Sequence, residues 1–343
     1  MQSLPLLPTT VIGSYATPSW LWTAMEEIKH GRYGTTDLNE TYDDAVRMAI
    51  GDQERAGVDI ISDGEMRRFF FVQNFYRKIE GLEELEPFRK TGLYAYDSVP
   101  RYRPVEKITV PHGLGIVEEF TFLKENTQKR IIATCPGPLT LTIHLHLRKG
   151  GAYADRLELA NDLAGVVNAE LKALVEAGAD YVQIDEPSSA IIPGDLRDWI
   201  ALINRAIDGV NAKIGLHICF GNLLSRPRGK RTYRWMFPAL LDVNCHRFLF
   251  EFANRELSEI EMWKDVGDDR EFAAGLVDVK SFYVESPEDV AERIRTALNS
   301  IPAEKLYITP DCGFFPVPRW LAFLKLKNMV AGTKIVRKEL GVE

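Results

Sequence analysis

The sequence has few cysteines for its length. There are four of them among 343 residues, and they are widely separated: Cys135, Cys219, Cys245 and Cys312. A disulfide framework needs a denser set in a much shorter chain. We therefore expect reduced thiols, as in a cytoplasmic protein, and reduced thiols can become thiolate ligands of a metal ion.

Long apolar runs and an excess of basic residues are also missing. No stretch approaches the roughly 18–20 apolar residues of a membrane span. Residues 1–5 lack the basic and apolar parts of a signal peptide. The formal net charge is −7, which gives no electrostatic reason to expect nucleic-acid or acidic-membrane binding. We expect a cytoplasmic protein without membrane or nucleic-acid partners.

The sequence does contain a regular alternation of strand-like and helical segments. Eight strand-like runs are separated by helices, one of them expected near residues 233–241. An open doubly wound sheet would alternate in the same way, but this number of strands favours a closed α/β fold, the (β/α)8 TIM barrel. Residues 75–129 break the rhythm, and we interpret them as a partly hairpin-like insertion after the second strand. Residues 1–343 are thus expected to form a single barrel domain.

His217 and Cys219 are the most informative pair in the sequence. They lie two residues apart on a strand-like run, so the imidazole and the thiol project to the same side. Together they suit a zinc ion, and Glu251 and Cys312, which also follow strand-like runs, could complete the site. A buried Cys beside a His is more often simple packing, so the pair alone leaves both interpretations open.

Polar residues gather at the carboxyl ends of the predicted strands. The residues at these ends are Ser14, Glu65, Asp185, His217, Cys219, Glu251 and Cys312. TIM barrels carry their active sites at this end. This concentration of polar residues at one end of the predicted strands therefore favours a metal site over simple packing.

Zinc with a His and two Cys ligands would suit chemistry at sulfur. Two thiolate charges nearly neutralise the ion, and the remaining exchangeable position can bind a substrate thiol as the more nucleophilic thiolate. Asp185 and Glu65 could hold an α-ammonium group, while the backbone of Ile12, Gly13 and Ser14 could hold a carboxylate. Homocysteine is the natural candidate for such a substrate.

The motifs resemble the catalytic half of cobalamin-independent methionine synthase, a zinc (β/α)8 barrel. The likeness spans nearly the whole chain and depends on Val11-Ile12-Gly13-Ser14, Asp63-Gly64-Glu65, Gly137-Pro138, Gln183-Ile184-Asp185-Glu186-Pro187, His217-Ile218-Cys219, the strand of Glu251 and Thr309-Pro310-Asp311-Cys312-Gly313. The resemblance implies four zinc ligands, His217, Cys219, Glu251 and Cys312. It also implies contacts to the amino-acid end of homocysteine from Ile12, Gly13, Ser14, Glu65 and Asp185.

Three departures from this family concern the methyl donor. We expect one barrel where the full-length enzyme has two. His144 stands near the position of a folate-stacking Trp, and Lys280 replaces a proton-relaying His. A folate donor needs its leaving nitrogen protonated, whereas a corrinoid does not. The resemblance therefore implies methionine synthesis from homocysteine with another donor, such as a methyl-corrinoid or a corrinoid protein, and makes Lys280 and Asp185 catalytic candidates.

Several alternatives stay open. His144 and Lys280 could replace the missing groups functionally, which would give a folate-dependent methionine synthase. A zinc alkyltransferase for another thiol, similar to the epoxide-opening coenzyme M transferases, could use Lys280 to protonate an alkoxide. A hydrolase that uses Asp185 and Glu186, or a barrel that only binds amino acid or metal, would belong to a different class.

Overall fold

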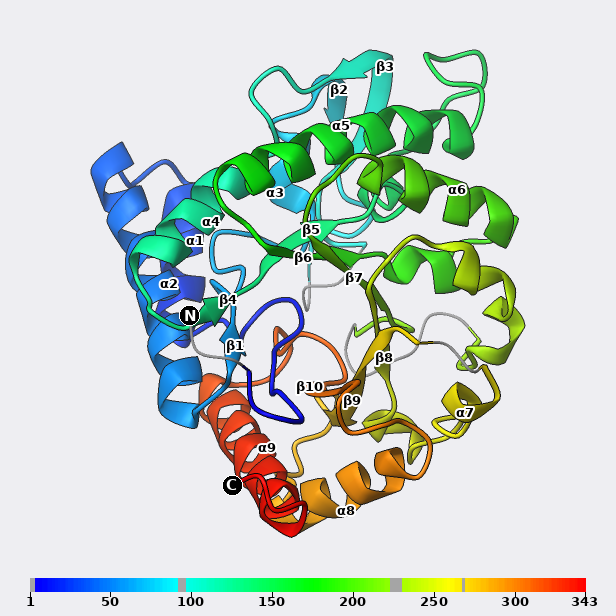
Figure 1. Cartoon of the computed structure of the whole chain (residues 1–343). Helices are drawn as coiled ribbons and strands as arrows, with labels where there is room; N and C mark the ends of the chain where they lie inside the picture. Colours follow the sequence, from blue (N-terminus) through cyan, green and yellow to red (C-terminus); the bar gives the residue numbers. More distant parts are fainter. Residues whose placement is uncertain (1–3, 92–96, 223–229, 267–268) are drawn as a thin grey trace. The chain divides into compact units, whose positions relative to one another are not determined.

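The computed structural model describes residues 4–91, 97–222, 230–266 and 269–343. Figure 1 shows the whole chain. The chain divides into two compact units. The first comprises Met1–Arg67, Phe122–Ile132 and Arg247–Glu343, and the second comprises Arg68–Thr121 and Ala133–His246. Each unit contains parallel strands with helices against them, and the units are treated in turn.

Three strands of the first unit pair in parallel. They are β8 (Arg247–Glu251), β9 (Glu271–Val277) and β10 (Leu306–Pro310), paired in the order β10-β9-β8. All residues of β8 and β10 are buried. Strands covered on both faces are expected to be apolar throughout rather than alternating, as Phe248-Leu249-Phe250 illustrates.

Short pairings extend this set of strands to the start of the chain. Thr9 forms a parallel bridge to β10, and Thr10 forms one to β1 (Ile60–Ile61). β1 then pairs in parallel with β4 (Arg130–Ile131). The first strand-like run of the sequence therefore occupies a strand position but makes only isolated bridges there.

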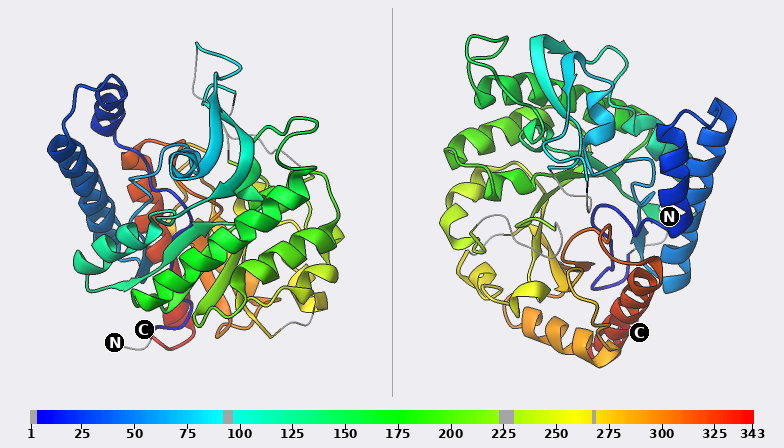
Figure 2. Two further views of the ribbon diagram at one scale, coloured as in Figure 1. Left: turned by 90° about the horizontal axis from the view of Figure 1, so that it is seen from above. Right: turned by 180° about the vertical axis from the view of Figure 1, so that it is seen from behind.

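The helices of the first unit are α1 (Ser19–Lys29), α2 (Thr35–Ala56), α7 (Met262–Val266), α8 (Pro287–Leu298) and α9 (Arg319–Glu339). α1 and α2 lie side by side (Figure 2), and α9 packs against both α2 and α8. Ser286 and Asp289 close a capping box at the start of α8, and Pro287 begins that helix. A short 3₁₀ helix, Ala253–Arg255, follows β8.

The second unit contains a parallel set ordered β5-β6-β7. These strands are β5 (Ala133–Pro136), β6 (Tyr181–Asp185) and β7 (Lys213–Ile218). The long helices α5 (Arg156–Glu176) and α6 (Leu196–Ile207) pack against each other (Figure 1). 3₁₀ helices at Thr140–Thr142 and Pro187–Ala190 follow β5 and β6.

The helix expected near residues 233–241 is not an α-helix. The structure has two separate 3₁₀ helices there, Arg234–Met236 and Ala239–Asp242. Pro238 lies between them and follows a cis peptide bond. Proline lacks an N–H group and excludes the residue before it from helical geometry, so a continuous helix cannot pass this point.

The stretch interpreted as an insertion begins with the short helix α3 (Gln73–Tyr76) and contains an antiparallel pair. β2 (Glu80–Leu85) pairs with β3 (Arg101–Thr109), and α4 (Ile116–Glu125) follows. Residues 92–96 of this stretch lie outside the described residues. Tyr102 of β3 donates its N–H to the carbonyl of His144 (2.9 Å) and accepts from the N–H of His146 (2.8 Å), which joins the hairpin to the segment after β5.

Among the helices that the structure describes, none has both the length and the apolar character needed to cross a membrane.

Candidate metal centre

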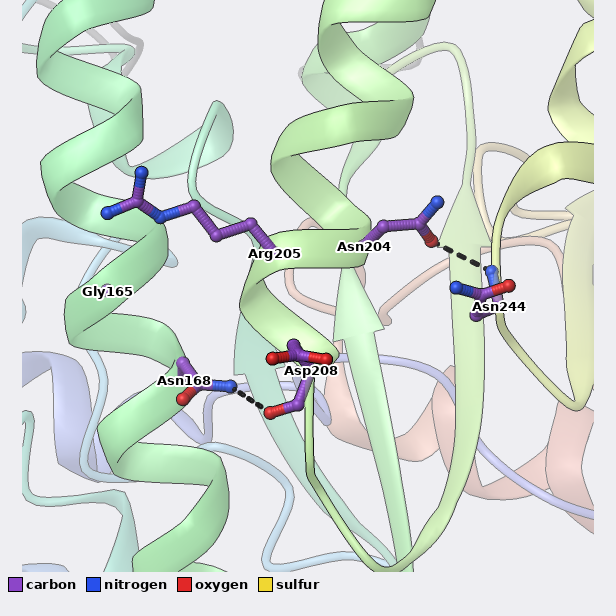
Figure 3. A pocket seen from close by; sticks show the side chains of 6 residues that line it. All are labelled: Gly165, Asn168, Asn204, Arg205, Asp208 and Asn244. Atoms are coloured by element: carbon purple, nitrogen blue, oxygen red, sulfur yellow. Dashed lines mark hydrogen bonds between the residues drawn. The ribbon is translucent and has the colours of Figure 1, made fainter.

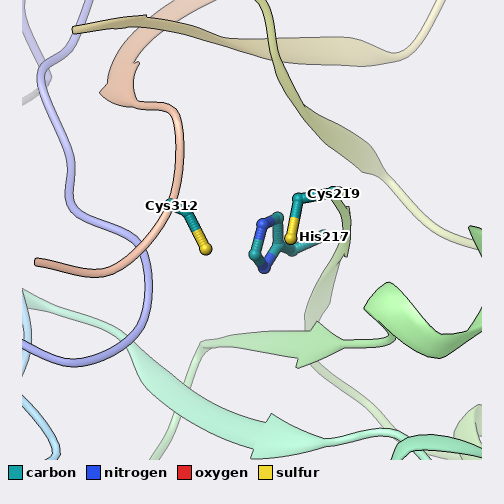
Figure 4. Close-up of side chains that lie close together, drawn as sticks. All are labelled: His217, Cys219 and Cys312. Atoms are coloured by element: carbon teal, nitrogen blue, oxygen red, sulfur yellow. The ribbon is translucent and has the colours of Figure 1, made fainter. Parts of the chain in front are cut away.

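Three predicted ligands come together in the structure. His217 lies on β7, Cys219 directly follows it, and Cys312 follows β10. One ligand atom from each lies within 4.8 Å of the other two, and the three side chains face one another (Figure 4). Ligand atoms around a tetrahedral zinc ion stand about 3.3–3.8 Å apart. The cluster is therefore near the size and has the N/S chemistry that zinc requires.

His217 is held in one orientation by Asp185. The Nδ1 atom of His217 lies 2.6 Å from Oδ1 of Asp185, and both side chains are almost fully buried. The two residues face each other across neighbouring strands β6 and β7. A carboxylate on Nδ1 keeps the proton there, which leaves Nε2 to bind a metal. Asp185 is thus a support for the proposed ligand, a role that sequence reasoning missed.

The Oδ2 atom of Asp185 suggests a second role for this residue. Its Oδ1 accepts from Nε2 of Gln183 (2.7 Å). Its Oδ2, like Oε1 of Gln183, is buried and has no hydrogen-bond partner among the described residues. Buried acceptors are nearly always satisfied in proteins. This pair of oxygens is therefore suited to a ligand that donates hydrogen bonds.

The predicted Ile12–Ser14 turn contacts the acidic segment 63–65, which follows β1. Oγ of Ser14 donates to Oε2 of Glu65 (2.6 Å), and the N–H of Tyr15 donates to the carbonyl of Gly64 (2.9 Å). Glu65 is buried and has a positive φ of 53°. Such a backbone is costly for a residue other than glycine and is found most often at functional sites.

The segment after Cys312 packs directly on this turn. The N–H of Phe314 donates to the carbonyl of Ser14 (2.6 Å). A Cβ atom on Gly313 would lie 2.8 Å from the nitrogen of Ser14, so only glycine permits the approach. The structure therefore brings the Ser14 turn, Glu65 and the backbone of Gly313 and Phe314 together.

Glu251 and Lys280 form a buried ion pair. Nζ of Lys280 lies 2.9 Å from Oε2 of Glu251. Within the described residues, Glu251 is not a member of the three-residue group whose ligand atoms lie within 4.8 Å of one another. Its predicted role as a zinc ligand stays a prediction, as does a proton-donor role for Lys280.

A surface pocket lies elsewhere in the second unit (Figure 3). It is lined by Gly165, Asn168, Asn204, Arg205, Asp208 and Asn244. Asn168 donates to the carbonyl of Asp208 (2.8 Å), and Oδ1 of Asn204 accepts from the N–H of Asn244 (2.8 Å). These amides join α5, α6 and the loops that follow, and the pocket contains none of the predicted site residues.

Comparison with known proteins identifies the family. Residues 7–335 match the family model described as cobalamin-independent synthase, catalytic domain. The chain belongs to this family. It is 38% identical to a methionine synthase of Saccharolobus solfataricus, over 99% of this chain and 98% of the relative. It is 37% identical to a methionine synthase of Sulfurisphaera tokodaii, over 99% and 95% of the two chains.

A solved structure of the family extends the match to the fold. A B12-independent methionine synthase from Shewanella, in complex with selenomethionine, superposes with a TM-score of 0.82 at 29% identity, covering 98% of this chain and 100% of that one. The predicted family, the (β/α)8 barrel fold and the assignment as a methyltransferase are confirmed. Family members are zinc enzymes, which fits the donor set of His217, Cys219 and Cys312.

The hydrolase alternative pairs Glu186 with Asp185, but in the structure Glu186 accepts hydrogen bonds from the loop after β5. Its Oε2 accepts from the N–H of Leu139 (2.9 Å), and its Oε1 accepts from Oγ1 of Thr140 (2.5 Å). Burial raises the pKa of Glu186 to about 8. A Cβ atom on Gly137 would lie 2.2 Å from Oε2 of Glu186, so a side chain there would displace the carboxylate. Glu186 therefore holds the loop after β5, which argues against the hydrolase alternative.

His144 is buried beside the ring of Tyr76. Its ring meets that of Tyr76 edge-on, with centroids 6.1 Å apart and an interplanar angle of 86°. Burial, together with the charge of nearby His146, lowers the pKa of His144 to about 4. The imidazole is therefore neutral at pH 7 and presents no exposed face like that of a stacking Trp.

We predict that Cys219→Ser and Cys312→Ser each lose zinc, because a serine hydroxyl is a much poorer ligand for zinc than a thiolate. Metal content after dialysis, measured beside circular dichroism, tests this. Cys245→Ser is the matched control, since Cys245 is buried and lies outside the ligand group. Full metal occupancy in both ligand variants would contradict the assignment.

We predict that His144 destabilises the protein in acid. Its folded pKa is about 4, against 6.5 ordinarily. As the pH falls from 6.5 towards 4, the unfolded chain binds a proton that the folded chain does not, so the free energy of unfolding decreases, by on the order of 3 kcal/mol. Urea unfolding across this range should show a smaller decrease for His144→Gln. The exposed His112→Gln control should match the wild type, and parallel curves for all three proteins would refute the prediction.

Proposed function

We propose that this protein is a zinc-dependent methyltransferase that makes methionine from homocysteine, with a donor other than polyglutamyl methyltetrahydrofolate, such as a methyl-corrinoid. The observation that carries the proposal is the cluster of one imidazole and two thiols at His217, Cys219 and Cys312. In the reaction a sulfur–carbon bond forms, the bond from the methyl carbon to the donor breaks, and the thiol proton is lost.

The residues present fit zinc. Two thiols and an imidazole whose Nδ1 is engaged by Asp185 make up a three-ligand set, as in catalytic sites that keep one position for substrate. Zinc bound there would lower the pKa of an entering thiol and so supply a thiolate at neutral pH. Asp185 would keep the imidazole in the metal-binding tautomer.

The buried acceptors beside His217 support an amino-acid thiol. Oδ2 of Asp185 and Oε1 of Gln183 have no partner among the described residues, and an α-ammonium group would supply the missing donors. Glu65 is the second predicted partner of the ammonium group, and the Gly13–Ser14 backbone is the predicted partner of the carboxylate. A sulfonate thiol of the coenzyme M type carries no cation for Asp185, so homocysteine is favoured.

The surroundings of His144 and Lys280 favour a donor that leaves without a proton. His144 is buried and neutral at pH 7, so it cannot act as an acid there. Lys280 donates to Glu251 in a buried ion pair. A folate donor needs protonation of its leaving nitrogen, whereas a methyl-corrinoid leaves as cobalt(I), which keeps the electron pair of the broken bond. We therefore propose the corrinoid type of donor.

For the substrate, we predict that Asp185→Asn weakens homocysteine binding about ten- to a hundredfold, because a charged hydrogen bond is worth about 1.5–3 kcal/mol. The asparagine oxygen can still accept from Nδ1 of His217, so zinc should remain bound. Calorimetry with homocysteine, and with an alkanethiol that lacks the amino group as control, separates the two effects. An equal loss for both thiols, or no loss for either, would contradict the ammonium site.

For the donor, we predict methionine from methylcobalamin and homocysteine, and turnover with methyltetrahydrofolate lower by at least the roughly 10²–10⁴-fold that a positioned general acid contributes. Both donors should be tested at equal concentration with saturating zinc, and the folate in mono- and polyglutamyl forms. Cys312→Ser measures the uncatalysed background. Efficient synthesis from either folate would overturn the donor assignment while leaving the zinc and thiol assignments intact.

A further inference from the structure

Gln183 is a buried polar residue in the middle of β6. It lies two residues before Asp185, so the two side chains project to the same face of the strand. Gln183 is 0% exposed and Asp185 is 1% exposed. The polar atoms of a buried amide are normally all paired. The hydrogen bonds that Gln183 makes, and the one that it lacks, therefore bear on what this part of the protein binds.

Gln183 holds one oxygen of Asp185 in place. Its Nε2 donates to Oδ1 of Asp185 at 2.7 Å, and Nδ1 of His217 lies 2.6 Å from the same oxygen. The imidazole comes from β7, whereas the amide comes from the strand of the carboxylate itself. A carboxylate bound at one oxygen by two donors from different directions has little freedom to turn. Gln183 therefore helps to commit Oδ1 to His217 and leaves Oδ2 as the oxygen without a partner among the described residues.

The same hydrogen bond fixes the orientation of the amide. Oδ1 of Asp185 is an acceptor, so the donor Nε2 has to face it and Oε1 has to point elsewhere. Gly215 on β7, which is in register with Gln183, has no side chain. Thr134, the partner in register on β5, uses its hydroxyl to accept from Nη1 of Arg68 at 3.0 Å. Oε1 of Gln183 is buried and, within the part of the chain that the structure describes, has no hydrogen-bond partner.

Two buried acceptors thus belong to side chains that are joined by one hydrogen bond: Oε1 of Gln183 and Oδ2 of Asp185. Buried acceptors that lack a protein donor are satisfied by water or by a ligand. An ammonium group has three N–H donors and a positive charge, so it can pair with the carboxylate and the amide oxygen together. A hydroxyl has one donor and no charge. The two acceptors are therefore best matched by an ammonium group.

We propose that Gln183 is a specificity-determining residue that prepares the site for an amino-acid thiol. Its amide nitrogen commits one oxygen of Asp185 to His217, and its amide oxygen joins the other oxygen of Asp185 in receiving the ammonium group. This inference rests on the proposed function. It adds the residue that separates the metal-supporting role of Asp185 from its substrate-binding role.

The test compares homocysteine with its deamino analogue, the mercapto acid that has the same carbon chain, thiol and carboxylate but no amino group. Zinc content and the Kd of each thiol are measured for wild type, Gln183→Met, Gln183→Leu, Asp185→Asn and the double variant of Gln183→Met with Asp185→Asn. Methionine nearly keeps the length of glutamine while removing its donor and its acceptor. Circular dichroism checks the folding of each variant, and leucine provides a second side chain if methionine does not fit.

Gln73→Met is the matched control. Gln73 is also a buried glutamine of the second unit, and its Nε2 donates to the carbonyl of Pro100 at 3.1 Å. The substitution removes a buried amide and one hydrogen bond, as Gln183→Met does, but it leaves both Asp185 and the acceptor pair unchanged. Its preference for homocysteine over the deamino analogue should therefore equal that of wild type, even if the protein is less stable.

We expect wild type to prefer homocysteine to the deamino analogue. Gln183→Met should lower homocysteine affinity by about tenfold or more, as expected when a hydrogen bond to a charged group is lost. Affinity for the analogue should change little, and zinc should stay bound because Asp185 keeps its contact with His217. In the Asp185→Asn background, Gln183→Met should have a clearly smaller effect on homocysteine affinity, because residues of one hydrogen-bond network are not additive.

Three results would overturn the role of Gln183. A folded Gln183→Met or Gln183→Leu protein with the wild-type preference for homocysteine would mean that Oε1 meets only water. An equal loss of affinity for both thiols, or failure of both variants to fold, would make Gln183 a support of the fold instead. A wild type that binds no zinc, or that does not prefer homocysteine to the analogue, would overturn the proposed function together with this inference, so the two failures are told apart.

Discussion

The hydrogen bond between Asp185 and His217 is the constraint on which the rest of the site depends. It joins two residues that face each other across β6 and β7, and it fixes the tautomer of the imidazole. Parallel pairing alone places the two Cα atoms at the same level of the sheet. In the proposed function the same carboxylate would meet the ammonium end of the substrate through Oδ2, which is buried without a partner among the described residues. A single side chain would thereby relate metal and substrate geometry.

Carboxylates elsewhere at the strand ends have a different task. Glu186 holds the loop after β5 through Leu139 and Thr140, and Asp311 holds the turn after β8 through three backbone N–H groups. Loops at this end of a barrel cannot satisfy all of their own backbone groups, and a buried carboxylate can accept several N–H bonds at once. An acidic residue at a strand end can therefore hold a loop in place rather than take part in the reaction.

Much of the site was predictable from the sequence because it follows local rules. Two-residue spacing placed His217 and Cys219 on one face, and the strand-end rule added Cys312. The pairing of Lys280 with Glu251 was not predictable, because it joins the end of β8 to the loop after β9 through side-chain directions that only packing determines. The helix near residues 233–241 was predicted wrongly, because Pro238 cannot continue a helix and two 3₁₀ helices form instead.

The nature of the donor and the placement of Lys280 constrain each other. A folate leaving group requires a proton in the transition state, so the side chain at this position would have to release one to the donor. An ammonium group whose charge is needed to neutralise Glu251 is poorly suited to that task, because giving up its proton would strand a buried carboxylate. A corrinoid leaving group removes the requirement. With the proposed corrinoid donor the same lysine would keep its charge through the whole reaction, so the buried ion pair is consistent with that proposal.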